Sequence, residues 1–117
     1  MNLQIFGTKK CRDTQKALRF FAERSISVHF VDLNVKPISK GELESAARSV
    51  RLEELIDSGG RLYEKMNLKY IRHDIKEKIL ENPLLLKTPL VRSSGKATVG
   101  YCPDVWNVWI KENVIGE

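Results

Sequence analysis

The alternation of hydrophobic and polar residues divides the first third of the chain into three elements. Leu3 to Phe6 is a short apolar run ended by Gly7-Thr8, which predicts a strand. From Cys11 to about Arg24, apolar residues recur at helical spacing with charged residues on the opposite face, which predicts a helix. Ile26 to Leu33 has apolar residues on both faces, so we expect a second strand buried on both sides. This order predicts a βαβ unit with a right-handed crossover and parallel strands.

The middle of the chain has the pattern of several short helices. Ser39 is followed by Glu42 in a capping box, which predicts a helix reaching about Val50. Further helices are predicted over Leu52 to Ser58, Arg61 to Leu68 and Asp74 to Leu80. We interpret Asp57-Ser58-Gly59-Gly60 as a helix C-cap rather than an anion-binding loop, and Asn82-Pro83 as the end of the last helix. Together these helices form a predicted insertion at about 39–82.

The last third returns to strands and ends in a helix. Thr88 to Arg92 and Ala97 to Tyr101, joined by a turn at Ser93 to Lys96, predict a hairpin. Pro103-Asp104 opens a helix that is predicted to run through Ile110 or beyond. The whole order is βαβ, a helical insertion and ββα. It predicts an α/β fold with the thioredoxin or glutaredoxin architecture, formed as a single domain over 1–117.

Composition and charge narrow the class of protein. With 117 residues, of which 42% are hydrophobic, the chain suits one domain with a two-layer core. The formal charge of +5 comes from 20 basic and 15 acidic residues that are mixed along the chain, so we expect no direct binding of nucleic acid. There is neither an apolar run of about 18 residues nor the pattern of a secretory signal. We therefore expect a cytoplasmic protein that does not bind membranes.

Cysteine and histidine are candidates for chemistry, and each occurs twice. Two cysteines without a secretory signal argue for a reduced compartment, where a thiol that matters is catalytic or redox-sensing. His29 and His73 have no spacing to the cysteines that suits zinc, and we expect no metal. We expect His29 to be a core or edge residue of its strand and His73 to be solvated or to cap a helix.

Cys11 lies where the first helix is predicted to begin. The unpaired N–H groups and the positive end of the helix dipole favour an anion there, and Lys10 and Arg12 would act in the same direction, so the thiol is biased toward thiolate. Thr14 completes a C-x-x-T motif; its hydroxyl can hydrogen-bond the thiolate but cannot resolve a mixed disulfide. Catalysis would then need an external thiol. The alternative is that Cys11 is an ordinary small buried residue.

Cys102 is a candidate second thiol. It follows the second strand of the hairpin, whose end is predicted to lie at the same sheet edge as Cys11. One strand separates the two ends, which gives about 10 Å between them. A disulfide needs Cα atoms within about 7 Å, so a direct bond between the two cysteines would require movement of the loop.

Three stretches give the chain a resemblance to a known family. The chain resembles the arsenate reductase (ArsC) family in FGTKKCRDTQKAL near the start, LYEKMNL in the insertion and LLKTPLVRSSGKATVGY in the hairpin region. That family has a thioredoxin fold and also contains the Spx-type transcriptional regulators. The resemblance covers nearly the whole chain. It implies that Cys11 is the catalytic cysteine and that Pro89 is preceded by a cis peptide bond and faces Cys11.

The resemblance also marks departures from the family. Arsenate-reducing members hold the oxyanion with arginines at three positions, which correspond here to Thr88, to Asp57 or a close neighbour, and to Cys102. The cations that remain nearby are Lys10, Arg61, Lys87 and Arg92. Of these we expect Lys10 and Arg92, together with Thr88 and Pro89, to bind substrate or stabilise the thiolate.

The sequence therefore predicts a thiol-based redox protein that acts through Cys11, either on an oxyanion, as the resemblance to arsenate reductases implies, or by thiol–disulfide exchange. We expect no bound cofactor, and the external thiol would be glutathione, another small thiol, glutaredoxin or thioredoxin. The resemblance implies one alternative, an Spx-like regulator that binds RNA polymerase without being an enzyme. Such regulators carry a C-x-x-C switch, and Thr14 removes its second cysteine here. A third interpretation is that the chain keeps the fold without redox activity.

Overall fold

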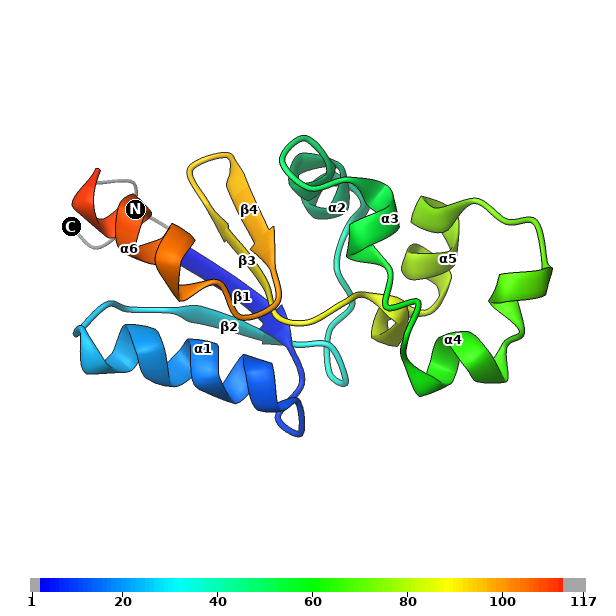
Figure 1. Ribbon diagram of the computed structural model, residues 1–117, viewed down its shortest axis with the longest axis horizontal. Coiled ribbons are helices and arrows are strands. Elements are labelled where there is room, and N and C mark those ends of the chain that lie inside the picture. Colours follow the sequence, from blue (N-terminus) through cyan, green and yellow to red (C-terminus); the bar gives the residue numbers. More distant parts are fainter. Residues whose placement is uncertain (1–2, 113–117) are drawn as a thin grey trace.

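One mixed sheet forms the centre of the molecule in the computed structural model, which describes residues 3–112. Its strands are β1 (Leu3–Gly7), β2 (His29–Asp32), β3 (Leu90–Ser93) and β4 (Lys96–Val99). Within the described residues the strand order is β2-β1-β3-β4, with β1 and β2 parallel and the other two pairs antiparallel (Figure 1). The predicted βαβ unit, hairpin and α/β fold class are thereby confirmed.

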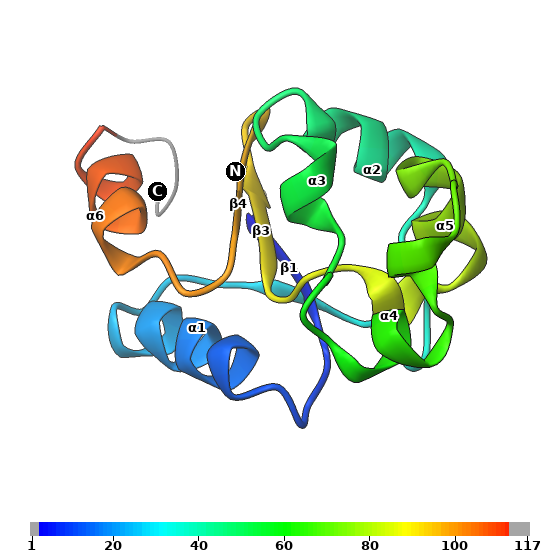
Figure 2. The same ribbon diagram turned by 45° about the vertical axis from the view of Figure 1, so that its right-hand side comes forward.

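The helices fall into two groups that lie on opposite sides of this sheet (Figures 1 and 2). The elements are α1 (Arg12–Glu23), α2 (Lys40–Ala47), α3 (Leu52–Leu55), α4 (Arg61–Lys65), α5 (Ile75–Glu81) and α6 (Pro103–Lys111), with short 3-10 turns η1 (Leu68–Tyr70) and η2 (Pro83–Leu85). In Figure 2, α1 and α6 lie on one side of the sheet and α2 to α5 on the other. The helical insertion thus supplies the second layer of the core.

The layer between the sheet and helices α1 and α6 is rich in aromatic rings. Its buried members are Leu3, Ile5, Ala17, Phe20, Phe21, Val91, Trp106 and Trp109. Trp106 is fully buried, its ring lies 5.3 Å from that of Phe20 and 5.1 Å from that of Phe21, and its Nε1–H donates a 2.9 Å hydrogen bond to Thr98 Oγ1. Because a buried indole N–H without a partner is costly, Thr98 on β4 fixes the position of α6 against the sheet.

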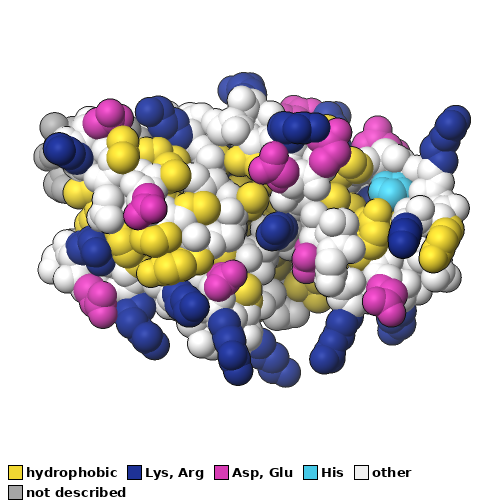
Figure 3. Space-filling model, in the orientation of Figure 1, with side chains coloured by type: hydrophobic (Ala, Val, Ile, Leu, Met, Phe, Trp, Pro, Cys, Tyr) yellow, Lys and Arg dark blue, Asp and Glu magenta, His cyan; other side chains and the backbone are white. Residues whose placement is uncertain are grey.

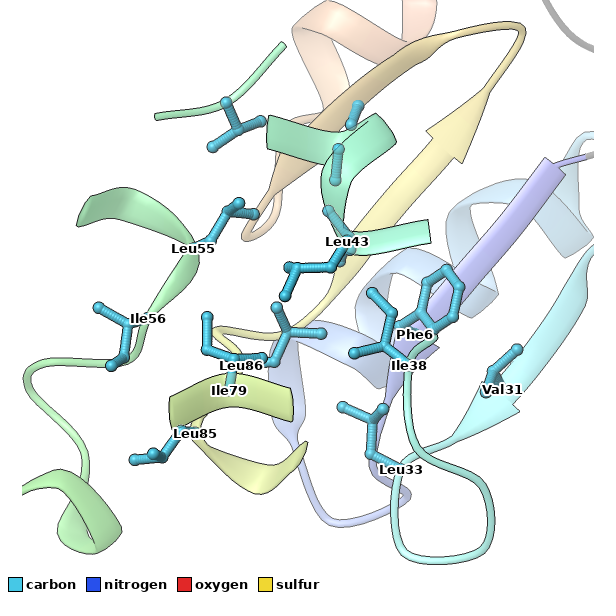
Figure 4. Packing of buried hydrophobic residues seen from close by; sticks show 14 of the residues in the cluster. Phe6, Val31, Leu33, Ile38, Leu43, Leu55, Ile56, Ile79, Leu85 and Leu86 are labelled. Atoms are coloured by element: carbon cyan, nitrogen blue, oxygen red, sulfur yellow. The ribbon is translucent and has the colours of Figure 1, made fainter. Parts of the chain in front are cut away.

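The opposite layer is mainly aliphatic and holds the insertion against the sheet (Figure 4). Phe6 and Val31 come from the sheet, whereas Leu43, Leu55 and Ile79 come from three helices of the insertion. Side chains alternate across a strand, so Ile5 enters the aromatic layer and its neighbour Phe6 enters this one.

The start of α2 confirms the predicted capping box. Ser39 Oγ accepts a hydrogen bond of 3.1 Å from the Glu42 N–H, and Glu42 Oε1 accepts one of 2.9 Å from the Ser39 N–H. Two donors that would otherwise be unpaired at the helix N-terminus are thereby satisfied.

Strand β2 is shorter than predicted. It covers only His29–Asp32 rather than Ile26 to Leu33. Val31 packs into the aliphatic layer and Phe30 against the aromatic layer, so both faces are covered as expected, but His29 at the start of the strand is exposed. The reason is that β2 pairs only with β1 and so forms a sheet edge. Ile26 and Val28 pack against the aromatic layer from the segment before the strand.

Three helices of the insertion, α2, α3 and α4, end earlier than predicted. Helix α2 ends at Ala47 rather than about Val50, and α3 ends at Leu55. Ile56 leaves α3 to form an isolated antiparallel bridge with Leu86, so Asp57 to Gly60 does not form the predicted C-cap. Gly60 is instead the N-cap of α4. The bridge is a contact between distant residues, which local sequence pattern does not reveal.

The hairpin turn lies where the sequence predicted it. Ser94 and Gly95 have φ values of 50° and 79°, the left-handed pair that a two-residue turn between β3 and β4 requires.

On the face shown in Figure 3, Lys and Arg side chains are interspersed with Asp and Glu. This distribution matches the mixed charge pattern of the sequence.

Candidate active site around Cys11

Cys11 lies between the end of β1 and the start of α1, as the sequence predicted. It is the N-cap residue of α1, with extended backbone angles, and its N–H donates a 3.2 Å hydrogen bond to Thr8 O. The thiol is half-buried. This position puts the sulfur beside the unpaired N–H groups of the first helical turn.

Thr88 approaches the same sulfur from the other half of the chain. The Thr88–Pro89 peptide bond is cis, as the family resemblance implied. Thr88 Oγ1 donates a hydrogen bond of 3.2 Å to Cys11 Sγ, and the thiol in turn lies 3.8 Å from Thr88 O. The residues that precede β3 therefore contact the thiol that precedes α1.

The surroundings of Cys11 lower the pKa of its thiol. Burial by itself raises this pKa, but the polar groups that face the sulfur outweigh burial, so the pKa lies below its ordinary value. These groups are the hydroxyls of Thr14 and Thr88 and the N–H groups of Thr14 and Asp13. These donors stabilise the thiolate because they interact more favourably with the charged sulfur than with the neutral thiol. The helix N–H groups and the Thr14 hydroxyl thus act on the sulfur as the sequence predicted, and Thr88 adds a donor from the other half of the chain.

Thr14 is built into the site by a close contact with β1. Its side chain is fully buried, and within the described residues its hydroxyl makes no hydrogen bond. A Cβ atom on Gly7 would lie 2.4 Å from Thr14 Oγ1, so only glycine leaves room for this side chain. A buried hydroxyl next to the sulfur gains a strong acceptor when Cys11 ionises.

A cavity of about 390 Å³ opens beside the thiol. It is lined by Thr8, Lys10, Cys11, Leu33, Asn34, Asp57, Leu84, Leu86 and Thr88. The structure thus brings together Lys10, Cys11 and Thr88, as predicted, and adds Asp57, which sequence reasoning had placed in a helix cap. The only signal for this place was the resemblance, which aligned Asp57 or a neighbour with a residue of the family's site.

The other predicted cations lie elsewhere. Arg92 is not among the cavity residues; its guanidinium donates to Gln4 Oε1 and lies near Glu42, so the expectation that it belongs to the site is corrected. The reason is that Arg92 is the third of the four residues of β3 and pairs with Gln4, toward the end of β1 that is far from Cys11. Arg12 and Arg61 are exposed in the first turns of α1 and α4 and do not line the cavity either.

Cys102 remains separate from Cys11, and both cysteines are free thiols. Cys102 is the N-cap of α6 and donates a 3.3 Å hydrogen bond from Sγ to Val99 O. Burial raises the pKa of its thiol above the ordinary value. The two cysteines thus differ in character, since only the environment of Cys11 favours a thiolate.

Neither His29 nor His73 lines the cavity beside Cys11. His29 is an exposed residue of the edge strand β2. His73 is half-buried, and its Nδ1 lies 2.7 Å from Ile71 O. The residue that caps α5 is Asp74 rather than His73.

Among residues 3–112 there is no group of three or more His, Cys, Asp and Glu side chains arranged to hold a metal ion. None of the described helices is both long and apolar enough to span a membrane.

A βαβ–ββα arrangement with a cysteine at the N-cap position of α1 and a cis-proline beside it defines a thioredoxin-like fold. A sequence model of the ArsC family matches residues 6–108, and the chain belongs to that family. It is 27% identical over 109 residues to the global transcriptional regulator Spx 2 of Oceanobacillus iheyensis, a match that covers 89% of this chain and 80% of the relative.

Solved structures confirm the fold. The YFFB protein superposes with a TM-score of 0.83 at 21% identity, covering 92% of this chain and 97% of that one. An arsenate reductase from Vibrio cholerae superposes with a TM-score of 0.77 at 20% identity, covering 90% and 94%. The expected thioredoxin-like architecture is therefore correct.

Proposed function

We propose that this protein is a monothiol redox protein that uses the Cys11 thiolate to reduce disulfides, with an external thiol as the electron donor. The observation that carries the proposal is the convergence of Thr14, Thr88 and the first N–H groups of α1 on one half-buried sulfur. The thiolate is the nucleophile in thiol–disulfide exchange, so an environment that stabilises it favours this chemistry at neutral pH.

The reaction proceeds in two exchanges. The Cys11 thiolate attacks one sulfur of a substrate disulfide, the S–S bond breaks, one substrate thiolate leaves, and a mixed disulfide remains on Cys11. An external thiol, deprotonated, then attacks the substrate sulfur of the mixed disulfide and releases the Cys11 thiolate. Over the cycle the substrate disulfide is reduced and the external thiol is oxidised to a disulfide with the second substrate half.

Thr14 determines that the second exchange is intermolecular. A threonine three residues after Cys11 offers no sulfur, and Cys102 donates its hydrogen to Val99 O with a raised pKa. Glutathione or another low-molecular-weight thiol, or a glutaredoxin or thioredoxin, would therefore complete the cycle. No bound cofactor takes part in these two steps.

The proposal is tested by the reaction of the reduced protein with bis(2-hydroxyethyl) disulfide, an uncharged substrate. Intact-mass spectrometry at pH 6.5 is expected to show one adduct, and peptide mapping to place it on Cys11. Adding reduced glutathione is expected to remove the adduct. Cys11→Ser should abolish adduct formation, whereas Cys102→Ser should leave its rate unchanged. No adduct on Cys11, or equal rates for both cysteines, would overturn the proposal.

A second candidate function is supported by the similarity to Spx 2, which is described as a global transcriptional regulator. In this alternative the protein binds RNA polymerase and carries out no redox turnover. Purified RNA polymerase is the probe, and size-exclusion chromatography of the mixture is the measurement. Co-elution that persists in the Cys11→Ser variant would favour the regulator, and separate elution would remove this alternative.

A further inference from the structure

The cavity beside Cys11 contains one positive and one negative side chain. Apart from the thiol itself, Lys10 and Asp57 are the ionisable groups that line it. Among the described residues neither side chain has an ion-pair partner within 4.0 Å, so they are not paired with each other. The cavity therefore offers a ligand one positive and one negative side chain beside the nucleophilic sulfur.

The position of Asp57 is fixed by the surrounding backbone. Its N–H donates a 2.8 Å hydrogen bond to Leu85 O, next to the bridge between Ile56 and Leu86. A Cβ atom on Gly60 would lie 2.3 Å from Asp57 Oδ2, so the glycine leaves space for this carboxylate. Gly60 has an ordinary negative φ of −87°, so backbone conformation does not require glycine there.

The rest of the lining divides into an apolar wall and polar groups. Leu33, Leu84 and Leu86 supply the apolar part, and Leu84 is 47% exposed. A ligand with a short aliphatic segment between a sulfur and a charged group would place that segment against these leucines. A thiolate and a carboxylate in the same cavity, opposed by one ammonium group, disfavour a dianion.

We propose that the Cys11 cavity selects disulfides of zwitterionic amino-acid thiols, with Asp57 receiving the substrate ammonium group and Lys10 its carboxylate. This inference rests on the proposed disulfide-reducing function and names its substrate class. The reaction is the exchange described above: the Cys11–S bond forms, the substrate S–S bond breaks, and an amino-acid thiolate leaves. The external thiol supplies the electrons in the second exchange.

The test compares four disulfides that differ in charge. Cystine is zwitterionic, cystamine cationic, 3,3′-dithiodipropionate anionic and bis(2-hydroxyethyl) disulfide uncharged. Rate constants for adduct formation on Cys11 are divided by those of N-acetylcysteinamide with the same disulfide, which removes differences in leaving-group chemistry. Cystine is expected to give the highest normalised rate and dithiodipropionate the lowest.

Variants assign the selectivity to the two side chains. Asp57→Asn is expected to slow adduct formation with cystine and cystamine by about two- to fivefold relative to the uncharged disulfide, which is the effect of one partly screened charge pair. Lys10→Gln is expected to slow adduct formation with cystine and dithiodipropionate by a similar factor. Asp104→Asn removes a carboxylate that is exposed on α6 and does not line the cavity, and serves as the control.

A pair of glycine variants tests the placement of the carboxylate. Gly60→Ala should displace Asp57 and reduce the preference for cystine, whereas Gly59→Ala, whose added Cβ meets nothing within 4 Å, should not.

Glutathione disulfide carries the same zwitterionic group at the end of a tripeptide. Its rate is compared with that of cystine to determine whether the cavity prefers the disulfide of a free amino acid or that of a peptide. Equal normalised rates for all disulfides, unchanged by Asp57→Asn, would overturn this inference while leaving the redox function intact. Absence of any adduct, including that of the uncharged disulfide, would overturn both.

Discussion

The Thr88 hydroxyl donates a 3.2 Å hydrogen bond to the Cys11 sulfur across a sequence separation of 77 residues. Cys11 belongs to the βαβ half of the fold and Thr88 to the ββα half. The antiparallel pairing of β1 with β3 places the end of one strand beside the start of the other, which brings the two residues together. The thiol site therefore depends on correct assembly of both halves.

Thr88→Val is expected to make Cys11 less reactive at neutral pH. The substitution keeps the shape of the side chain and removes one hydrogen-bond donor from the thiolate, so the thiol pKa should rise. Alkylation by iodoacetamide at pH 7 should slow several-fold. Thr8→Val is the matched control, because Thr8 lines the same cavity but its hydroxyl makes no hydrogen bond to the sulfur among the described residues. Equal slowing in both variants would contradict the role given to Thr88.

Gly7→Ala is expected to destabilise the fold and disturb Thr14. The added methyl group would lie 2.4 Å from Thr14 Oγ1 and 2.7 Å from its Cγ2, so the side chain or α1 must move. Overpacking of this kind costs roughly 1–3 kcal/mol of the free energy of unfolding, which urea denaturation would measure.

Gly41→Ala provides the contrasting variant for this measurement. Gly41 lies within α2, where an added Cβ meets nothing within 4 Å. Alanine there should stabilise the protein by about 0.5–1 kcal/mol because glycine is a poor helix former. A stabilising effect of Gly7→Ala would show that the contact with Thr14 is not as tight as the structure indicates.

Glu42 is expected to make stability depend on pH. Burial raises the pKa of its carboxyl group, but hydrogen bonds from the N–H and hydroxyl of Ser39 and the charge of Arg92 outweigh this effect and lower it. Because the folded-state pKa is lowered, the stabilisation is present above the unfolded pKa and is lost as pH falls through the folded pKa. The difference in unfolding free energy between wild type and Glu42→Gln should therefore be positive at pH 7 and shrink as the carboxyl group is protonated. A difference independent of pH would contradict this assignment.

Trp106→Phe is expected to weaken the attachment of α6. The variant loses the 2.9 Å hydrogen bond to Thr98 and part of the ring contacts with Phe20 and Phe21. The expected loss is about 1–3 kcal/mol of the free energy of unfolding. Val108→Ala, at a position on α6 that is 49% exposed, should change stability by less than about 0.5 kcal/mol. Comparable losses in the two variants would argue against the anchoring role of Trp106.

The sequence predicted the fold well because its signals are local. The capping box at Ser39, the proline at the start of α6 and the turn at Ser94-Gly95 each specify an element through their own backbone chemistry. The order of elements then leaves few topologies. The length of β2 was overestimated because its place at the sheet edge is a property of the assembled sheet.

The site could be predicted only in part. Cys11 was found from its position before a helix, and Thr88 and Pro89 from the family resemblance. The contact between Gly7 and Thr14, and the place of Asp57 in the cavity, depend on distances between separate elements. Arg92 was wrongly included because closeness to Thr88 in sequence does not mean closeness in space along an extended strand.

The pH dependence of Cys11 alkylation tests the central claim most directly. Rates of reaction with iodoacetamide are measured from pH 4 to pH 10 in the Cys102→Ser variant, so that only one thiol reacts. The thiolate-stabilising contacts of Thr14 and Thr88 predict a midpoint below that of a free thiol, which is about 8.5. They also predict a shift of the midpoint to higher pH in Thr88→Val. A midpoint at or above the free-thiol value, unchanged by Thr88→Val, would contradict the account of Cys11 as an activated thiol.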